Sequence, residues 1–475
     1  MKKIFSSLFL IALALVLVAC GDQGDRTQAK AKLVEWYELS PDAEFDTTKP
    51  VTINFWHRMG SASQIIVAEW IEKFKVLYPN ITVNAVKAGD DYNQLAEKIG
   101  IAIPAGTMPD IAESYPDHIA RYALGDAPLA LNYFISHPTL GYSEEELADF
   151  LPSLWAEGAS YDQAGTILSL PFTKSSEGFF YNKTYFDQHG YEVPTTWDQV
   201  FEIAEDIKKR EPNAFPFGYD SEDNLFITAS KQWGAPYTGY NEQTGKGEVL
   251  FNNDQSKEMV KYFKDKVDKG LMLTRTLNGE AYTSDIFKTG SRLYMYVGST
   301  GGTRYAYNQE LFDKDMRVGV APLPSKDGKG AQVQQGPNIN LFNSGDEQRM
   351  IAAWLFAKFM ISAENTAQFA IPSGYAPIRY SAYETQIWKD YVDGIKDNPT
   401  TLAEAQNKLV KEAIDMFRNN GEIFFTQAVF SQSSKARTEV GALLVSIFAY
   451  NAPNEDALNA YINSEYQKKY NFVTN

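Results

Sequence analysis

Few residues of this chain have a type and spacing that would support catalysis or metal binding. The four histidines, at positions 57, 118, 137 and 189, show neither the i,i+4 pairing nor the cysteine companions of a zinc site. The chain has no phosphate-binding P-loop and no His-Glu-x-x-His pair, and residues 298–302 lack the Gly-x-Ser-x-Gly spacing of a nucleophile elbow. We therefore predict no metal, no cofactor and no enzymatic activity. A glycoside-cleaving enzyme that uses two carboxylates remains an alternative, because the separation of the carboxylates in space, not in sequence, decides that mechanism.

Binding of a carbohydrate is the chemistry that the composition favours. Aromatic rings stack on the C–H faces of sugars, and the sugar hydroxyls need oriented donors and acceptors. The chain offers 28 tyrosines and 8 tryptophans. His57 and Arg58 follow an alternating segment, Val51–Trp56, at the strand end where α/β clefts open. We predict His57 and Arg58 as cleft residues, and Trp56 as a core residue.

The charge balance limits the classes of partner. Acids outnumber bases by 60 to 44 over 475 residues, which gives a net charge of −16. Such a chain has no basic surface to follow nucleic acid phosphates or to attract anionic lipid. We therefore predict neither partner, and a length that suggests two or three structural units.

The first twenty residues are typical of an export signal. A basic start, Met1–Lys3, precedes an apolar run, Leu8–Ala19, which is too short to span a bilayer as a helix. Its ending, Leu17-Val-Ala-Cys20, resembles a bacterial lipoprotein signal, in which Cys20 carries the lipid. We predict a signal peptide at 1–19 and a flexible lipid-anchored tether at 20–49, with Trp36 and Tyr37 able to pack on the body; a plain signal peptide is the alternative.

The rest of the chain alternates between strand and helix patterns. Strands are expected at 51–56, 81–86 and from 109, with helices from 63 and over 92–103 between them, which indicates an α/β unit with a mostly parallel sheet. Further strands are expected at 166–171, 178–181, 293–297 and 316–321. Helices are expected at 197–209, 346–361, 402–418, 433–450 and 456–466.

Four segments, in order, resemble the extracellular solute-binding proteins that serve carbohydrate ABC importers, most closely the maltose-binding and glycerol-3-phosphate-binding types. They are residues 53–60 leading to 78–83, residues 109–117, residues 170–198 (Leu-Pro-Phe-Thr-Lys-Ser-Ser, Tyr-Asn-Lys, Pro-Thr-Thr-Trp-Asp), and residues 287–379 ending in Ser-Gly-Tyr-Ala-Pro-Ile-Arg.

The resemblance implies an α/β fold of two discontinuous lobes around a hinge, the type II periplasmic binding-protein fold. Lobe one would comprise about 50–161 plus 315–377, and lobe two 162–314 plus 378–475. A monomeric protein would close on its ligand and deliver it to membrane permease subunits, outside the cytoplasm and attached to the membrane only through its lipid. A role as partner of a sensor receptor stays open.

The resemblance also implies individual ligand contacts. Lys174 and Glu177 could share the role of Ser175 or face solvent, Arg379 could instead pair with an acid, and Trp233 is expected as a stacking platform from lobe two. The residues carried over, besides His57 and Arg58, are Tyr92, Asp117, Ser175, Trp233, Ser299, Gly336, Asn338, Tyr375 and Arg379.

The ligand expected from these residues is a neutral mono- or short oligosaccharide. The glycerol-phosphate binder uses an arginine that would fall near residues 422–431, where this chain has none. Glycerol-3-phosphate or another polyol derivative is the alternative ligand.

Overall fold

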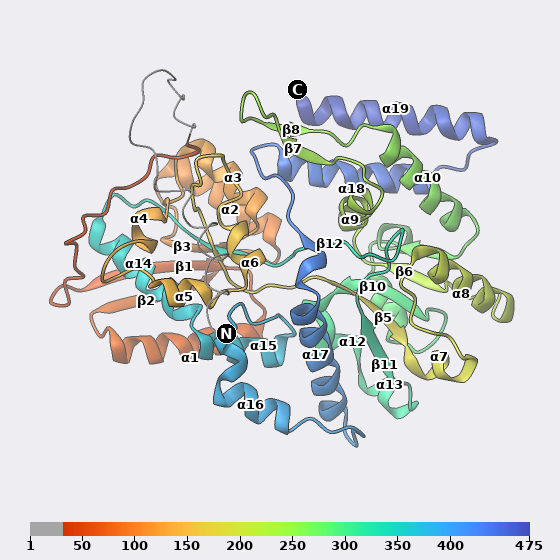
Figure 1. Ribbon diagram of the computed structural model, residues 1–475, viewed down its shortest axis with the longest axis horizontal. Coiled ribbons are helices and arrows are strands. Elements are labelled where there is room, and N and C mark those ends of the chain that lie inside the picture. Colours follow the sequence, from red (N-terminus) through yellow and green to blue (C-terminus); the bar gives the residue numbers. More distant parts are fainter. Residues whose placement is uncertain (1–31) are drawn as a thin grey trace, which may run out of the picture.

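The computed structural model describes residues 32–475, so the predicted signal peptide and Cys20 lie outside the described residues. Two five-stranded sheets form the centres of two lobes, which lie side by side in Figure 1. The first sheet has the order β2-β1-β3-β13-β4 and the second the order β11-β5-β10-β6-β9. No helix among these residues is both long enough and apolar enough to cross a membrane.

Lobe one is built on the first sheet, whose β1 pairs in parallel with β2 and β3. Its core contains large buried aromatics, among them Phe55, Trp70 and Trp354. The strands are β1 (Val51–His57), β2 (Ile81–Lys87), β3 (Ile111–Ser114), β4 (Leu170–Pro171) and β13 (Asn338–Leu341). The helices are α1 (Ser61–Leu77), α2 (Tyr92–Ala105), α3 (Pro116–Tyr122), α4 (Asn132–Ile135), α5 (Glu144–Ala148), α6 (Pro152–Glu157), α14 (Glu347–Met360), α15 (Ala363–Ser373) and α16 (Gln386–Asp393).

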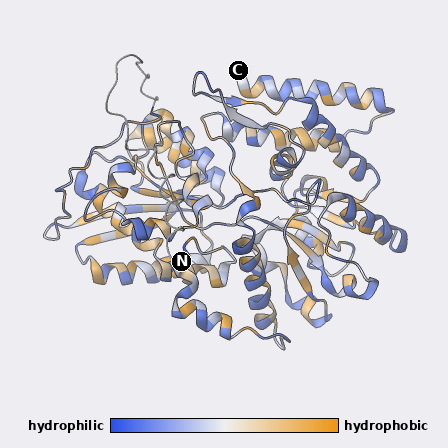
Figure 2. Ribbon diagram, viewed as in Figure 1, coloured by the Kyte–Doolittle hydropathy of each residue, from blue (hydrophilic) through white to orange (hydrophobic). Residues whose placement is uncertain are grey.

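Lobe two is built on the second sheet, with Trp197, Phe217 and Phe226 in its core. Its helices show hydrophilic and hydrophobic residues alternating along their length in Figure 2, as helices with one buried face do. The strands are β5 (Glu177–Asn182), β6 (Phe217–Tyr219), β9 (Met272–Thr274), β10 (Met295–Ser299) and β11 (Val318–Ala321). The helices are α7 (Lys183–His189), α8 (Trp197–Arg210), α9 (Glu222–Gln232), α10 (Asp254–Asp268), α11 (Thr283–Phe287), α12 (Thr303–Ala306), α13 (Gln309–Asp313), α18 (Ser433–Ala449) and α19 (Glu455–Thr474).

Four of the five strands of each sheet run in the same direction, which agrees with the mostly parallel sheet predicted for the first unit, and one strand of each is reversed. β13 runs antiparallel to β3 and β4, and β5 runs antiparallel to β10 and β11. The physical reason is that β13 and β5 each follow a segment that arrives from the other lobe. Each therefore enters its sheet where the neighbouring strands end, and runs in the opposite direction to them.

The chain crosses between the lobes at a hinge of adjacent extended segments. β4 belongs to the first sheet and β5 to the second, so one crossing lies between residues 171 and 177; β11 and β13 place another between 321 and 338. Both crossings lie later in the chain than the predicted boundaries at 161/162 and 314/315. Helix α17 (Leu402–Asn419), the pair β12 (Gln332–Val333) with β14 (Phe424–Phe425), and the hairpin β7 (Thr238–Tyr240) with β8 (Gly247–Val249) complete the described chain.

Residues 32–49 of the predicted tether lie against lobe one. The indole of Trp36 donates to Thr166 (3.0 Å), the Tyr37 hydroxyl donates to Glu347 (2.9 Å), and the backbone N–H of Leu33 donates to Asp162 (2.8 Å). Val34 and Leu39 are buried. This part of the predicted tether is therefore packed on the body rather than free of it.

Candidate functional site

A cleft of about 590 Å³ lies between the facing edges of the two sheets. Arg58 and Tyr115 follow β1 and β3 on the side of lobe one, and Ser299 and Asp220 lie at or directly after the ends of β10 and β6 on the side of lobe two. Loops at the carboxyl ends of strands thus position the side chains that line the cleft, as in other open α/β sheets.

On the wall of lobe one, Arg58 is held by two phenols and a carboxyl. Its Nη2 donates to the hydroxyls of Tyr92 (3.0 Å) and Tyr375 (3.2 Å), and its backbone N–H donates to Glu113 (2.5 Å). Burial raises the pKa of Glu113 to about 7, against the opposing influence of Arg58. The Nε of Arg58 is buried and has no protein partner. The guanidinium therefore keeps a donor for an additional acceptor.

On the wall of lobe two, two carboxyls lie in the cleft without a cationic partner among the described residues. Glu177 is 2% exposed and accepts from the hydroxyls of Tyr219 (2.8 Å) and Thr228 (3.4 Å). Its burial raises its pKa to about 8. Asp220 accepts from the backbone N–H and the hydroxyl of Thr283 (2.5 and 2.7 Å), and burial raises its pKa also. Both can offer hydrogen bonds to a hydroxylated ligand.

Tyrosines supply the apolar surfaces of the cleft. Tyr305 and Tyr282 line the cleft and are 64% and 48% exposed, so their rings are open to contact with a ligand. Arg275 lies over the Tyr282 ring at 4.6 Å. The tyrosines that line the cleft are Tyr92, Tyr115, Tyr282, Tyr296, Tyr305 and Tyr375.

The structure brings part of the predicted site together. Five of the predicted residues line this cleft: Arg58, Tyr92, Ser175, Ser299 and Tyr375. Asp117 lines an adjoining space of about 270 Å³, together with Tyr92, Tyr115 and Arg437.

Lys174 and two other predicted residues form a buried cluster at the hinge. The ammonium of Lys174, which is 0% exposed, donates to Glu157 (2.5 Å), to the carbonyl of Gly336 (2.9 Å) and to the amide oxygen of Asn338 (3.1 Å). Gly336 has φ +91°, and a Cβ there would lie 2.0 Å from the Thr173 carbonyl oxygen. Lys174 is thus neither a cleft residue nor solvent-facing.

Three further predicted residues lie outside the cleft and have structural partners. His57 is 2% exposed, and burial lowers its pKa to about 4. Trp233 packs on Tyr262 and Phe263 in the core of lobe two. Arg379 donates to the carbonyl of Ile361 (2.8 Å), pairs with Asp149 (3.4 Å) and stacks on Phe150 at 3.8 Å, so the alternative of pairing with an acid is the one observed.

Sequence reasoning missed several residues at the cleft. Asp220, Ser221 and Glu222 follow the short strand β6, which has no alternating pattern long enough to detect. Arg437 lies six positions beyond the segment that lacked an arginine. It lies over the Tyr115 ring at 6.0 Å and pairs with Asp223 (2.9 Å). The only available signal was its place near the start of a predicted helix.

Comparison with known proteins agrees with this architecture. The sequence profile of the bacterial extracellular solute-binding proteins matches residues 69–396. The sn-glycerol-3-phosphate-binding periplasmic protein UgpB of Rhizobium meliloti (strain 1021) is 25% identical over 380 residues, which cover 78% of this chain and 84% of that relative. UgpB of Brucella melitensis biotype 1 is 26% identical over 277 residues, 56% of this chain, and the match spans only 61% of the relative's length.

Two solved structures share the fold at low sequence identity. UgpB from Mycobacterium tuberculosis, in complex with glycerophosphocholine, superposes with a TM-score of 0.70 at 22% identity and covers 89% of this chain and 98% of its own. The sugar-binding protein MalE from Xanthomonas citri has a TM-score of 0.68 at 16% identity, with 89% and 97% covered. These structures confirm the predicted two-lobe α/β fold.

Proposed function

The chain belongs to the bacterial extracellular solute-binding protein family, and we propose that it is the lipid-anchored substrate-binding protein of a carbohydrate ABC importer. It captures a mono- or short oligosaccharide in the cleft between its lobes and presents it to the membrane permease. It acts as a monomer and performs no catalysis.

The observation that carries this proposal is the composition of the cleft. Tyrosines, hydroxyl groups and carboxyls from both lobes surround a space of about 590 Å³. A ligand that touches both walls binds the closed arrangement better than the open one, and only that difference in affinity can drive closure. The closed form is then what the permease distinguishes.

The charges in the cleft favour a neutral ligand over a phosphate ester. Of the basic residues that line it, Lys288 pairs with Asp285 (2.6 Å) and Arg275 lies near Glu280 (3.8 Å). Among the described residues that line the cleft, Arg58 is the base without a salt bridge, and Glu177 and Asp220 line the same cleft. A dianionic phosphate would find one unpaired base beside these carboxyls, whereas a sugar hydroxyl can hydrogen-bond to a carboxyl in either protonation state.

Export and anchoring complete the proposal. The signal at 1–19 and lipid attachment at Cys20 place the protein outside the cytoplasm, held to the cell membrane by acyl chains. The packing of residues 32–49 on lobe one supports a tether that ends near residue 32.

A sugar titration tests the ligand class. The full-length mature protein is titrated with D-glucose, D-galactose, maltose, cellobiose, D-xylose, L-arabinose and xylobiose. It is also titrated with glycerol-3-phosphate and glycerophosphocholine. Tryptophan fluorescence reports binding. Saturable binding of a neutral sugar with a Kd on the order of micromolar, about −8 kcal/mol, is expected. No fluorescence change with any sugar, together with a change on adding either phosphate compound, would overturn the carbohydrate assignment.

Glycerol-3-phosphate or a related polyol phosphate is the second candidate. The named UgpB relatives and Arg437 at the end of the cleft favour it. Against it, Arg437 already pairs with Asp223 and hydrogen-bonds to Asn224, so a phosphate would compete with a carboxylate of the same lobe.

A further inference from the structure

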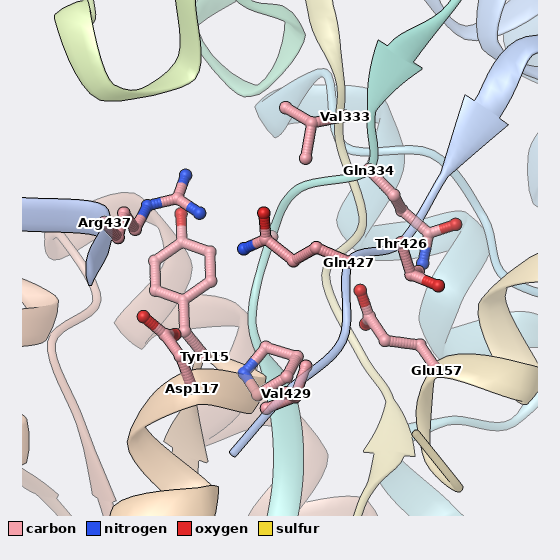
Figure 3. Close-up of a pocket in the computed structure, with 11 residues that line it drawn as sticks. Tyr115, Asp117, Glu157, Val333, Gln334, Thr426, Gln427, Val429 and Arg437 are labelled. Carbon is pink, nitrogen blue, oxygen red and sulfur yellow. The ribbon is translucent and has the colours of Figure 1, made fainter. Parts of the chain in front are cut away.

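A second, smaller cavity of about 30 Å³ lies behind the wall of the cleft, toward the hinge. Figure 3 shows Tyr115 and Arg437 on one side of this space, Glu157, Gln334 and Thr426 on the other, and Gln427 reaching between them. These residues come from several parts of the fold. They are the α3 region and α6 of lobe one, α18 of lobe two, and the hinge segments that follow β12 and β14.

The cavity contains polar atoms with no protein partner. Gln334 is 6% exposed, and neither its Oε1 nor its Nε2 has a hydrogen-bond partner; the Oε1 of Gln427 is also buried without one. An unpaired buried amide costs about 1–3 kcal/mol. Native proteins leave few such groups unpaired, so three orphan atoms around one cavity indicate that something else pairs with them.

The cavity is connected to the ligand cleft through the space next to that cleft. Tyr115, Asp117 and Arg437 line both this cavity and the space of about 270 Å³ next to the main cleft. A substituent of a bound ligand that passes between Tyr115 and Arg437 would therefore reach the two glutamines. There it would touch both lobes and two hinge segments at once.

The size and the donors define the group that fits. A water molecule needs about 10–15 Å³ of such volume, so the cavity has room for about two small heavy atoms. Each amide offers an acceptor and donors, which suits a hydroxyl because it donates one hydrogen bond and accepts others. The two cations nearby are already paired, Lys174 with Glu157 and Arg437 with Asp223, and this disfavours an anionic group.

We propose that this cavity is a subsite that binds the hydroxymethyl group of the ligand through Gln334 and Gln427. The inference rests on the proposed function, because it assigns one group of the same carbohydrate. It makes the two glutamines specificity-determining residues that distinguish a hexose from the pentose lacking its hydroxymethyl group.

Near-isosteric methionine variants test the subsite. Gln334→Met and Gln427→Met remove the orphan polar atoms and nearly keep the side-chain volume, and Gln467→Met on the exposed face of α19 is the matched control. Affinity is measured for the tightest-binding sugar of the panel and for the pairs D-glucose with D-xylose, D-galactose with L-arabinose, and cellobiose with xylobiose. The Tm of each ligand-free protein is recorded as well.

We expect the wild type to prefer the hexose of a pair at least tenfold, and each cavity variant to lose at least tenfold in affinity and to reduce that preference below threefold. The ligand-free Tm should stay constant or rise. Affinity within twofold of the wild type overturns the subsite: a raised Tm then indicates an empty cavity, and a lowered Tm a structural water. A loss of affinity that leaves the preference unchanged overturns it also. A wild type that binds no sugar refutes the proposed function instead.

Discussion

The Lys174 cluster at the hinge and the cleft contain similar polar side chains, but they differ in how completely these are paired. At the hinge, the three donors of Lys174 meet Glu157, Gly336 and Asn338 in a site with no access to solvent. In the cleft, Arg58 keeps an unpaired Nε, and Glu177 has no cationic partner within the described chain. Fully paired groups hold the crossing segments together, whereas incompletely paired groups await a ligand.

Substitutions in the two regions should therefore change different measured quantities. Breaking the hinge cluster should lower the free energy of unfolding, and altering the cleft should lower affinity. Variants in each region test whether the two quantities change independently.

Lys174→Met should have the largest effect, because it leaves the Glu157 carboxylate buried and unpaired. Loss of about 3–5 kcal/mol in the free energy of unfolding is expected, measured by urea denaturation. The exposed Lys329→Met should change it by less than about 0.5 kcal/mol. The double variant Lys174→Met/Glu157→Gln should recover part of the loss. If Lys174→Met is as stable as the wild type, the hinge cluster does not hold the fold.

Arg58→Lys should mainly affect affinity. Lysine keeps the charge but lacks the planar guanidinium group. It therefore cannot donate to both tyrosine hydroxyls and still offer a donor to the ligand. We expect the Kd for the tightest-binding sugar to rise about 10–30-fold, equivalent to about 1.4–2 kcal/mol, with a small change in Tm. Titration calorimetry measures it, and Arg210→Lys on the exposed face of α8 is the control. An unchanged Kd would remove Arg58 from the site.

Glu177→Gln should sharpen the comparison through pH. The folded-state pKa of Glu177 is raised to about 8, whereas an unfolded glutamate titrates near 4.3. The folded protein therefore binds more protons between these values, and Glu177 makes the wild type lose stability as pH rises from about 4.5 to 8. The variant should lack this part of the pH dependence and be more stable than the wild type by about 1–3 kcal/mol at pH 9. Parallel stability curves from pH 4 to 9 would contradict it.

Tyr305→Ala and Trp233→Phe form the pair with the smallest expected effects. Removing the exposed Tyr305 ring from the cleft should raise the Kd about 3–10-fold, since a stacking contact contributes about 0.5–1.5 kcal/mol. Trp233→Phe should leave the Kd unchanged, because Trp233 packs on Tyr262 and Phe263. The opposite order of effects would restore Trp233 as the stacking platform.

Local sequence patterns predicted most of the long helices, though not α10, and the longer strands, but few of the short elements. The strand at 51–56 and the helices at 402–418 and 433–450 match β1, α17 and α18 to within about one residue. These elements are long and periodic, so burial of one face determines them. The first lobe boundary was placed about ten residues too early, because β4 joins the first sheet through pairing with the distant β13, which no local pattern reports.

The candidate site was only partly predictable for the same reason. Arg58 was identified from its place at the end of a clear strand. Lys174 adjoins the predicted Ser175, yet its side chain points to Glu157 because successive residues of an extended segment face opposite ways. Gln334 and Gln427 carry no sequence signal at all, since only folding brings the two hinge segments together.

The attachment of residues 32–49 to lobe one affects how an anchored molecule would move. If Cys20 carries acyl chains as proposed, the twelve residues before Leu33 would span at most about 40 Å, and the anchor would connect to lobe one alone. Lobe one would then stay near the bilayer, while lobe two would move relative to it. The cleft would therefore open and close next to the membrane surface, where the permease lies.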